Sequence, residues 1–459
     1  MTESSKVHEN WSSKPAFLLS AIGFAVGLGN FWRFPYIAGE GGGGAFVLIY
    51  LTVVLLIGAP LVAAELLIGR RGRLSPIGSM QKLASEAGAS PRWGLVGALS
   101  LLATFLILTF YSVVAGWALD YLAHAIVSGF ANITAEQSER LFDGLMASPF
   151  RLAFWQAIVI AVTVLITVRG LSGGIERASL IMMPTLFVIM IFLAVYGMFT
   201  SGFDAATSFL FSPDFSKVRP ETFLTAIGQA FFSVGIAMGG MMTYGAYMPS
   251  SIKVPSSALI IVGADTLVAL IAGLAIFPIV FSHGLEPGEG TGLVFHTLPL
   301  AFGEMEFGRA FAALFFLLLS AAALTSTLAN FEPLLSWAEE HRGWRRPAAG
   351  VSFGIAIFIV GAGSVLSFNL LADFHPLGFV EKFSDLTIYA LTDFVASNVL
   401  LPLGALLTAI FVGWVVKRDA LEQEMELGAG SLLFSVWLFL IRFVVPCAIV
   451  VLFVYAFIG

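Results

Sequence analysis

Long uninterrupted runs of apolar residues constrain this chain more than any other feature. The run from Gly94 to Leu119, for example, contains no charged residue, and a helix needs about 20 mostly apolar residues to cross a bilayer. Of the 459 residues, 58% are hydrophobic and 11% are charged, whereas a soluble domain carries about 25% charged residues. The composition therefore excludes a soluble enzyme, a disordered chain and a nucleic-acid-binding protein, and it predicts that the chain lies in a lipid bilayer.

Apolar segments of this kind recur between clusters of charged residues. We predict eleven transmembrane helices, at 15–38, 44–70, 93–126, 150–169, 178–202, 221–248, 256–282, 308–337, 348–370, 386–416 and 429–458. Most of the 23 lysines and arginines lie in connections on the side of the N-terminus, and basic residues favour the cytoplasmic side. We therefore expect a multi-pass protein of the cell inner (plasma) membrane, with the N-terminus in the cytoplasm and the C-terminus outside.

Two of the predicted spans contain glycine-rich interruptions, GFAVGLGN (23–30) in the first and SVGIAMGG (233–240) in the sixth. Glycines of this kind can allow close helix packing, or they can mark helices that unwind around a binding site. Interruptions at corresponding positions of two halves are typical of inverted-repeat transporters, so we favour unwinding. The expected organisation is a single membrane domain, 1–459, with repeats at 15–202 and 221–416 and an extra helix at 429–458.

Charged side chains inside membrane helices are costly, and each is therefore a functional candidate. Arg33 ends the first span and Asp393 begins the tenth, so they could pair across the mouth of a cavity or each reach outer water. Asp265 lies inside the seventh span with no basic neighbour in sequence. We expect a cation as its partner, with a hydrogen-bonded acid at a helix end as the alternative. Glu65 and Glu332 could cap backbone groups or titrate.

Span eight carries three consecutive hydroxyl residues, Thr325, Ser326 and Thr327. Such hydroxyls often bond back to carbonyl groups of their own helix. They can also hold a sodium ion beside unwound carbonyl groups, because hard cations prefer oxygen ligands.

Four stretches of the chain resemble the neurotransmitter:sodium symporter family. AVGLGNFWRFPYIAGEGGGGAFVLIY (25–50) is similar to the family's opening, and GQAFFSVGIAMGGMMTYGAY (228–247), LTSTLANFEP (324–333) and DFVASNVLLPLG (393–404) are similar to its sixth, eighth and tenth helices. The resemblance covers essentially the whole chain, and eleven spans are typical of the prokaryotic branch.

This resemblance implies an all-α polytopic membrane protein with a leucine-transporter-like inverted repeat of five plus five helices. Helices 1 and 6 would be discontinuous, and one extra helix would follow at the C-terminus. The implied function is sodium-coupled symport of an amino acid or closely related zwitterion by alternating access, which is not an enzymatic activity.

The resemblance also implies the residues of each site. The second sodium site would use Gly23, Val26, Ala322, Thr325 and Ser326. The first sodium site would use Ala25, Asn30, Ser233 and Asp265. The substrate would contact Phe24, Ala25, Gly27, Leu28, Gly29, Ile107, Tyr111, Phe232, Ser233, Gly235, Met238, Ser326 and Asn330. The outer gate would consist of Tyr111 and Phe232 as an aromatic lid, with Arg33 and Asp393 above it.

Several positions refine the expected substrate. Gly27 stands where the biogenic-amine branch has aspartate, so the substrate is expected to bring its own carboxylate. Gly235 would leave room for its side chain, Met238 would adapt to it, and Asn330 would suggest a polar tip.

The inner gate departs from the family pattern. The family has an arginine three residues before the tryptophan that corresponds to Trp11, whereas this chain has His8, with Lys6 nearby. The acidic partner would be Glu340.

Two sodium ions are expected and chloride is not required. Tyr50, Gln229 and Ser233 match positions that hold chloride in animal members, and Asp265 would supply the negative charge instead. A transport-inactive amino-acid sensor on the same scaffold is the alternative, and an ion channel is disfavoured by Tyr111 and Phe232. The expected partners are a small zwitterionic substrate and the lipid bilayer, with no nucleic acid, for a chain that is a monomer or a homodimer.

Overall fold

The computed structural model describes residues 9–286, 292–428 and 430–458. Within these residues the regular elements are helical, apart from one isolated β-bridge between Gly43 and Pro213. The α-helices are α1 (Lys14–Ala25), α2 (Phe34–Glu40), α3 (Gly44–Val53), α4 (Ala59–Gly72), α5 (Pro76–Ala87), α6 (Gly94–Val127), α7 (Ala135–Met146), α8 (Pro149–Thr167), α9 (Arg177–Gly197), α10 (Phe203–Phe211), α11 (Pro220–Val234), α12 (Gly240–Ala246), α13 (Val254–Ser282), α14 (Leu298–Glu304), α15 (Gly308–Arg342), α16 (Arg346–Leu366), α17 (Ile388–Phe394), α18 (Leu401–Ile410), α19 (Arg418–Met425), α20 (Leu432–Phe439) and α21 (Val445–Ile458). Short π-helical segments continue several of them, namely η1 (Gly29–Arg33), η2 (Val54–Gly58), η4 (Leu171–Glu176), η6 (Leu293–Thr297), η8 (Val395–Leu400), η9 (Phe411–Val415) and η10 (Leu440–Val444).

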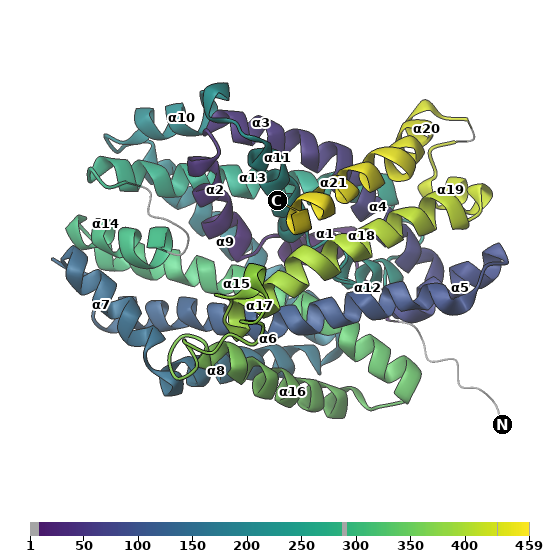
Figure 1. Cartoon of the computed structure of the whole chain (residues 1–459), viewed down its shortest axis with the longest axis horizontal. Helices are drawn as coiled ribbons and strands as arrows, with labels where there is room; N and C mark the ends of the chain where they lie inside the picture. The colour runs from purple at the N-terminus through teal and green to yellow at the C-terminus, as the bar shows by residue number, and fades with distance from the viewer. Residues whose placement is uncertain (1–8, 287–291, 429, 459) are drawn as a thin grey trace.

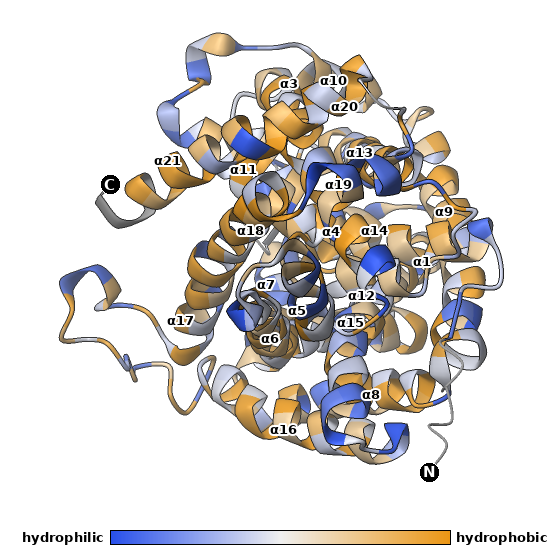
Figure 2. Ribbon diagram, turned by 90° about the vertical axis from the view of Figure 1, so that its right-hand side faces the viewer, coloured by the Kyte–Doolittle hydropathy of each residue, from blue (hydrophilic) through white to orange (hydrophobic). Residues whose placement is uncertain are grey.

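The long helices lie side by side, roughly along the horizontal of Figure 1. The short helices α7, α10 and α14 gather at one end of this bundle, whereas α5 and α19 lie at the other. Figure 2 views the bundle from the end with α5 and α19 and shows mostly apolar residues on peripheral helices such as α16, α18 and α21. This outward apolar covering suits a bundle that is surrounded by lipid.

Nine helices of the described residues are long and apolar enough to cross a membrane. The bent pair Lys14–Ala25 and Gly29–Gly39 gives a tenth span if the pair is counted as one. These ten agree with ten of the eleven predicted segments, although ends differ; the segment predicted at 178–202 is Leu171–Gly197. The remaining segment, 221–248, is divided between α11 and α12, each too short to cross alone.

The first glycine-rich interruption breaks the first span, as predicted. α1 ends at Ala25, Val26 is extended (ψ 104°), and the helical pieces on the two sides of the break meet at 54°. The N–H of Gly27 donates to Oδ1 of Asn30 (2.9 Å), and the N–H of Leu28 donates to Oη of Tyr111 (3.2 Å). These side chains supply acceptors for backbone donors that the broken helix no longer satisfies, as a membrane interior requires.

The second interruption separates α11 from α12. Gly235, Ala237 and Gly239 all have positive φ (71°, 63° and 75°). A non-glycine residue in this conformation costs about 1–2 kcal/mol, so Ala237 needs support from its surroundings. The support comes from Glu65 on α4, whose Oε1 accepts a hydrogen bond from the N–H of Ala237 (2.7 Å). Of the two roles considered for Glu65, capping a backbone group is the one that the structure displays.

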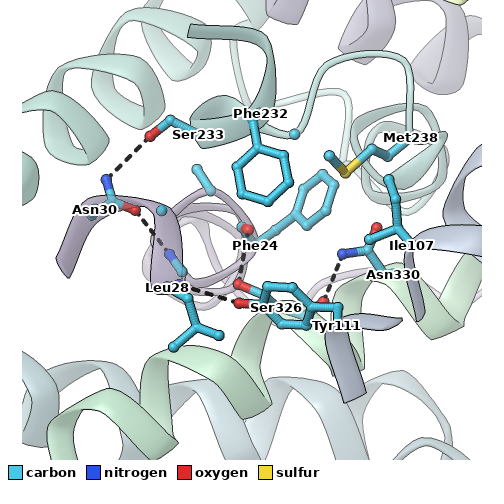
Figure 3. Close-up of a pocket in the computed structure, with 14 residues that line it drawn as sticks. Phe24, Leu28, Asn30, Ile107, Tyr111, Phe232, Ser233, Met238, Ser326 and Asn330 are labelled. Carbon is cyan, nitrogen blue, oxygen red and sulfur yellow. Dashed lines mark hydrogen bonds between the residues drawn. The ribbon is translucent and has the colours of Figure 1, made fainter. Parts of the chain in front are cut away.

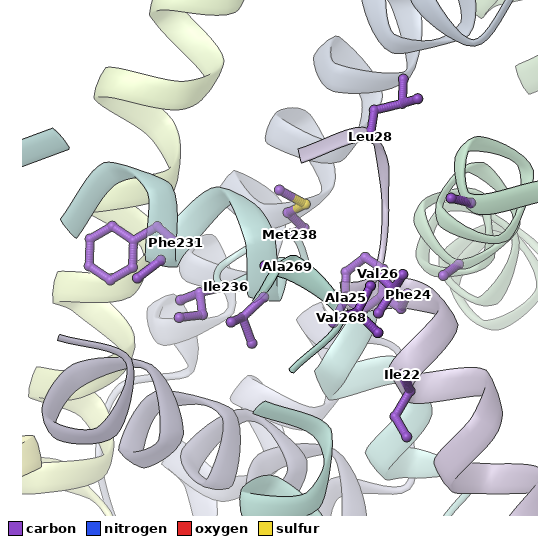
Figure 4. Packing of buried hydrophobic residues seen from close by; sticks show 14 of the residues in the cluster. Ile22, Phe24, Ala25, Val26, Leu28, Phe231, Ile236, Met238, Val268 and Ala269 are labelled. Carbon is purple, nitrogen blue, oxygen red and sulfur yellow. The ribbon is translucent and has the colours of Figure 1, made fainter. Parts of the chain in front are cut away.

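The two breaks meet in the centre of the bundle. Figure 4 shows Phe24, Ala25 and Val26 at the end of α1 near Met238 and Ile236 of the second break. α1 also packs against α9, α13 and α15. Residues about 200 positions apart in the chain thus form one central region, which is where the candidate site lies.

The support from Glu65 leads to a stability prediction. Glu65→Leu would fill a similar volume but leave the buried N–H of Ala237 without an acceptor, at a cost of about 1–3 kcal/mol. We expect a lower thermal unfolding midpoint of the purified protein in detergent. Glu65→Gln keeps an acceptor oxygen and should lose much less. Equal midpoints for Glu65→Leu and the wild type would contradict this role.

Candidate functional site

The broken helices enclose a small pocket (Figure 3). Its volume is about 30 Å³, which leaves room for about two water molecules, so its own side chains fill most of the space. The lining residues are Phe24, Ala25, Gly27, Leu28, Gly29, Asn30, Ile107, Tyr111, Phe232, Ser233, Gly235, Met238, Ser326 and Asn330. Each residue that the resemblance assigned to the substrate lines this pocket, and Asn30 joins them.

One pole of the pocket is polar and consists of backbone groups of the first break. Leu28 precedes η1, whose first residue is Gly29, so the start of a helical segment lines the pocket here. Helix N-termini bind anions, because their amide groups lack intrahelical acceptors. A Cβ atom at Gly27 would lie 2.7 Å from Oγ of Ser326 and 3.0 Å from Oη of Tyr111. A side chain at position 27 would therefore require Ser326 or Tyr111 to move.

The opposite pole is apolar and is formed by Phe24, Ile107, Phe232 and Met238. A Cβ atom at Gly235 would lie 2.7 Å from the ring of Phe24. Gly235 lines the pocket as expected, and the ring of Phe24 lies in the space beside it.

Asn330, which was expected to meet a polar tip of the substrate, is hydrogen-bonded within the protein. Its Oδ1 accepts from Oγ1 of Thr104 (2.7 Å), and its Nδ2 donates to the carbonyl of Ser326 (3.0 Å). Part of its hydrogen-bonding capacity is thus already used.

Asn30, Ser233 and Asp265 form a buried cluster beside the pocket. Nδ2 of Asn30 lies 2.7 Å from Oδ1 and 3.1 Å from the backbone O of Asp265, and 3.2 Å from Oγ of Ser233. The hydroxyl of Ser233 donates to Oδ2 of Asp265 (2.8 Å). Asp265 is fully buried (0% exposed), and none of the ion pairs among the described residues includes it. Several oxygens thus converge on one amide group, a donor set that also suits a hard cation.

A second group of oxygens lies where α15 meets the end of α1. Oγ of Ser326 is 3.3 Å from the carbonyl oxygens of both Phe24 and Val26. Oγ1 of Thr325 is 3.0 Å from the carbonyl of Ala322, and a Cβ atom at Gly23 would lie 3.3 Å from Cβ of Thr325. Thr325 thus makes the expected bond to its own helix while lying against α1. Carbonyl and hydroxyl oxygens again provide ligands suited to sodium.

Residues that match chloride-holding positions lie near this region. Oη of Tyr50 and Oε1 of Gln229 are buried and have no hydrogen-bond partner of normal geometry among the described residues. Nε2 of Gln229 donates to the carbonyl of Gly29 (3.2 Å). Ser233, the third such position, is already bonded to Asp265.

A larger cavity of about 430 Å³ adjoins the pocket. It shares Leu28, Gly29, Tyr111 and Phe232 with the pocket and is also lined by Trp32, Arg33, Tyr36, Ile37, Phe110, Val114, Thr225, Tyr389 and Asp393. The four shared residues separate the two spaces, so Tyr111 and Phe232 lie where a lid would be needed.

Arg33 and Asp393 line this cavity, but no ion pair within 4.0 Å joins them in the described part of the chain. The guanidinium of Arg33 instead lies over the ring of Phe232, 4.9 Å from its centroid. Asp393 accepts a hydrogen bond from Ser397 (2.8 Å). In this conformation the predicted pair is therefore open, because each member has another partner.

The start of the described chain is held against α12 and the residue that follows it. Trp11 is 2% exposed, and its indole N–H donates to the carbonyl of Tyr244 (3.0 Å). Its backbone N–H donates to the carbonyl of Tyr247 (3.1 Å). His8 and Lys6 lie outside the described residues, and Glu340 accepts from the N–H of Ser75 (2.5 Å).

Two further charged residues of the predicted spans contact other helices. Glu332 accepts from the hydroxyl of Tyr247 (2.9 Å) and pairs with Arg346. Arg442 donates to the carbonyl of Gly413 (2.5 Å), and its guanidinium lies over the ring of Trp414. Their sequence positions alone did not indicate these partners.

Comparisons with known proteins identify the family of the chain. The sequence profile described as the Sodium:neurotransmitter symporter family matches residues 8–139 and 146–459. The chain is 38% identical to the uncharacterized sodium-dependent transporter YhdH of Bacillus subtilis, over 96% of each chain. It is 33% identical to an uncharacterized sodium-dependent transporter of Haemophilus influenzae, over 99% of each chain.

A solved structure extends the similarity to three dimensions. The crystal structure of MhsT in complex with L-phenylalanine matches with a TM-score of 0.88 and 41% identity, covering 98% of this chain and 100% of that one. With the family matched over nearly the whole length, the chain belongs to the sodium:neurotransmitter symporter family, and it is a multi-pass, sodium-dependent transporter rather than an enzyme.

Proposed function

We propose that this protein is a sodium-coupled symporter that imports an amino acid or a closely related zwitterion by alternating access. The observation that carries the proposal is the two-sided pocket between the broken helices. Amide groups of Leu28 and Gly29 suit a substrate carboxylate at one pole, and apolar side chains suit a substrate side chain at the other. The L-phenylalanine bound in the matched MhsT structure supports a ligand of this class.

The proposed membrane topology counts the α11–α12 pair as an eleventh, broken span. The two breaks would then occupy corresponding positions in repeats 15–202 and 221–416, with 429–458 as the extra helix of one domain. The N-terminus would be cytoplasmic and the C-terminus outside. α5 and α19, which carry Lys82 and Arg418, lie at the same end of the bundle, which supports this orientation because basic residues favour the cytoplasmic side.

Two sodium ions are part of the proposal. Asn30, Ser233 and Asp265, with the carbonyl of Ala25, would hold the first ion next to the substrate carboxylate. The carbonyl groups of Gly23, Val26 and Ala322, with the hydroxyl groups of Thr325 and Ser326, would hold the second. The ions supply positive charge that offsets the substrate carboxylate in a poorly solvated site.

Closure of the outer side would involve the lid residues. Phe232 and Tyr111 separate the pocket from the larger cavity, and Arg33 contacts the ring of Phe232. Transfer of the Arg33 guanidinium from this ring to Asp393 would seal the cavity above a bound substrate. A charge pair formed in a closing, water-poor space is stronger than an exposed one, which contributes about 0–1 kcal/mol.

Counterflow in proteoliposomes tests the proposal as a whole. Vesicles loaded with an unlabelled amino acid should accumulate the labelled one transiently in sodium and not in potassium, because a carrier accelerates exchange. Sodium-dependent binding without exchange would contradict the proposed transport function and favour an amino-acid sensor on the same scaffold.

The second ion site predicts a shift in sodium dependence. Thr325→Val combined with Ser326→Ala removes both hydroxyl ligands and should raise the sodium concentration for half-maximal uptake by about tenfold or more. Thr327→Val is the matched control, because the hydroxyl of Thr327 bonds to the carbonyl of Leu324 (2.8 Å) and to Oγ1 of Thr163 (3.0 Å). An unchanged sodium dependence in the double variant would place the second ion elsewhere.

The buried carboxylate predicts that uptake needs no chloride. Asp265 lies against Ser233, and its negative charge offsets that of the bound cations. Uptake by the wild type should be equal in gluconate and chloride media. Asp265→Asn should be inactive in gluconate, and any activity that it has should require chloride. Asp393→Asn, the same exchange at the larger cavity, should remain indifferent to chloride. Loss of uptake by the wild type in gluconate medium would contradict this role of Asp265.

A further inference from the structure

One polar side chain that lines the pocket, that of Asn330, is held by a residue that lies outside the pocket. Asn330 lines the pocket and is 5% exposed. Thr104 on α6 does not line it and is fully buried (0% exposed). The hydroxyl of Thr104 lies 2.7 Å from Oδ1 of Asn330 and 3.1 Å from its backbone O. A hydroxyl has one proton to donate, and the shorter contact directs it to the side-chain oxygen.

This contact and the bond to the carbonyl of Ser326 together decide which end of the amide group can face a substrate. With Oδ1 held by Thr104, Nδ2 donates one hydrogen to the carbonyl of Ser326 (3.0 Å) and retains a second one. Figure 3 shows the amide nitrogen of Asn330 on the side of Ser326 and Tyr111. The pocket floor therefore offers a hydrogen-bond donor next to the apolar side chains of Ile107 and Met238.

We propose that Thr104 is a positioning residue for substrate specificity, acting through Asn330. By keeping the amide in one orientation, it makes the pocket accept apolar side chains and side chains that end in a hydrogen-bond acceptor. Substrate side chains that end only in a donor are disfavoured, because their N–H group would face the N–H group of Asn330 and find no acceptor. This inference rests on the proposed function of the pocket and names the class of side chain that it takes.

Removal of the Thr104 hydroxyl should weaken the preference. Thr104→Val conserves the shape but leaves Oδ1 of Asn330 without its donor, so only the bond from Nδ2 to the carbonyl of Ser326 (3.0 Å) still opposes rotation of the amide. An unpaired buried acceptor is costly, so a substrate that supplies a donor gains affinity relative to one that does not.

The experiment measures sodium-dependent binding of two phenylalanine analogues of similar size to the purified full-length protein. 4-Cyanophenylalanine ends in an acceptor and 4-aminophenylalanine in a donor. Because both carry a small substituent at the same ring position, most of its steric cost cancels in the ratio of their dissociation constants. The wild type should prefer the cyano analogue. In Thr104→Val the ratio should move toward the amino analogue by about fivefold or more, whereas Thr104→Ser should keep the wild-type ratio.

Thr163→Val is a control for loss of stability or packing. Thr163 is also a buried threonine, but its hydroxyl pairs with the hydroxyl of Thr327 and not with Asn330. A loss of packing weakens both analogues equally and leaves the ratio unchanged. If Thr104→Val does not fold, Asn330→Leu serves as the second variant, and it should abolish the preference.

The possible results separate this inference from the proposed function. A wild type that binds no amino acid in sodium would overturn both. If the wild type binds both analogues and Thr104→Val has the wild-type ratio of dissociation constants, only the positioning role of Thr104 is overturned. The same holds if Asn330→Leu retains the wild-type preference for the cyano analogue. A shifted ratio in Thr104→Val, with wild-type ratios in Thr104→Ser and Thr163→Val, would support it.

Discussion

The absence of water in a bilayer interior is the constraint on which this structure depends. Every backbone N–H and C=O there needs a partner within the protein, so a membrane helix can break only where other groups satisfy it. Asn30 and Tyr111 do so for the first break, and Glu65 does so for the second. Leu28 and Gly29, which line the polar pole of the pocket, lie directly after the first break. This pole therefore depends on how the break is stabilised.

Both breaks also depend on residues without side chains, although for different reasons. Gly27 is required by close approach, since a Cβ atom there would collide with Ser326. Gly235 and Gly239 are required by positive φ, which the chain adopts to leave α11 and enter α12. Phe24 then fills the volume beside Gly235, so one ring packs the two broken helices together. Rigid packing around the breaks keeps a nearly filled pocket from collapsing further.

Much of the fold could be predicted from the sequence, because lipid imposes a simple rule on length and polarity. The span positions, the first break and the lining residues of the pocket followed from apolar runs, paired glycines and a family resemblance. Contacts between distant residues could not be predicted in the same way. Nothing near Glu65 indicates Ala237 as its partner, and nothing near Arg33 indicates that its guanidinium lies over Phe232 rather than beside Asp393. Such choices depend on distances that exist only after packing.

The side chain of Asn30 has a consequence for energy coupling. Its oxygen bonds to Gly27 in the first break, and its nitrogen bonds to Asp265 on α13. The two atoms belong to one planar, rigid group, so a cation that competes with the nitrogen for Asp265 necessarily disturbs the oxygen as well. In the proposed transport cycle, an ion at this site would therefore act on the backbone of the first break through a single amide plane. Coupling between the ion and the substrate would then cross the width of one functional group, without a relay of intervening residues.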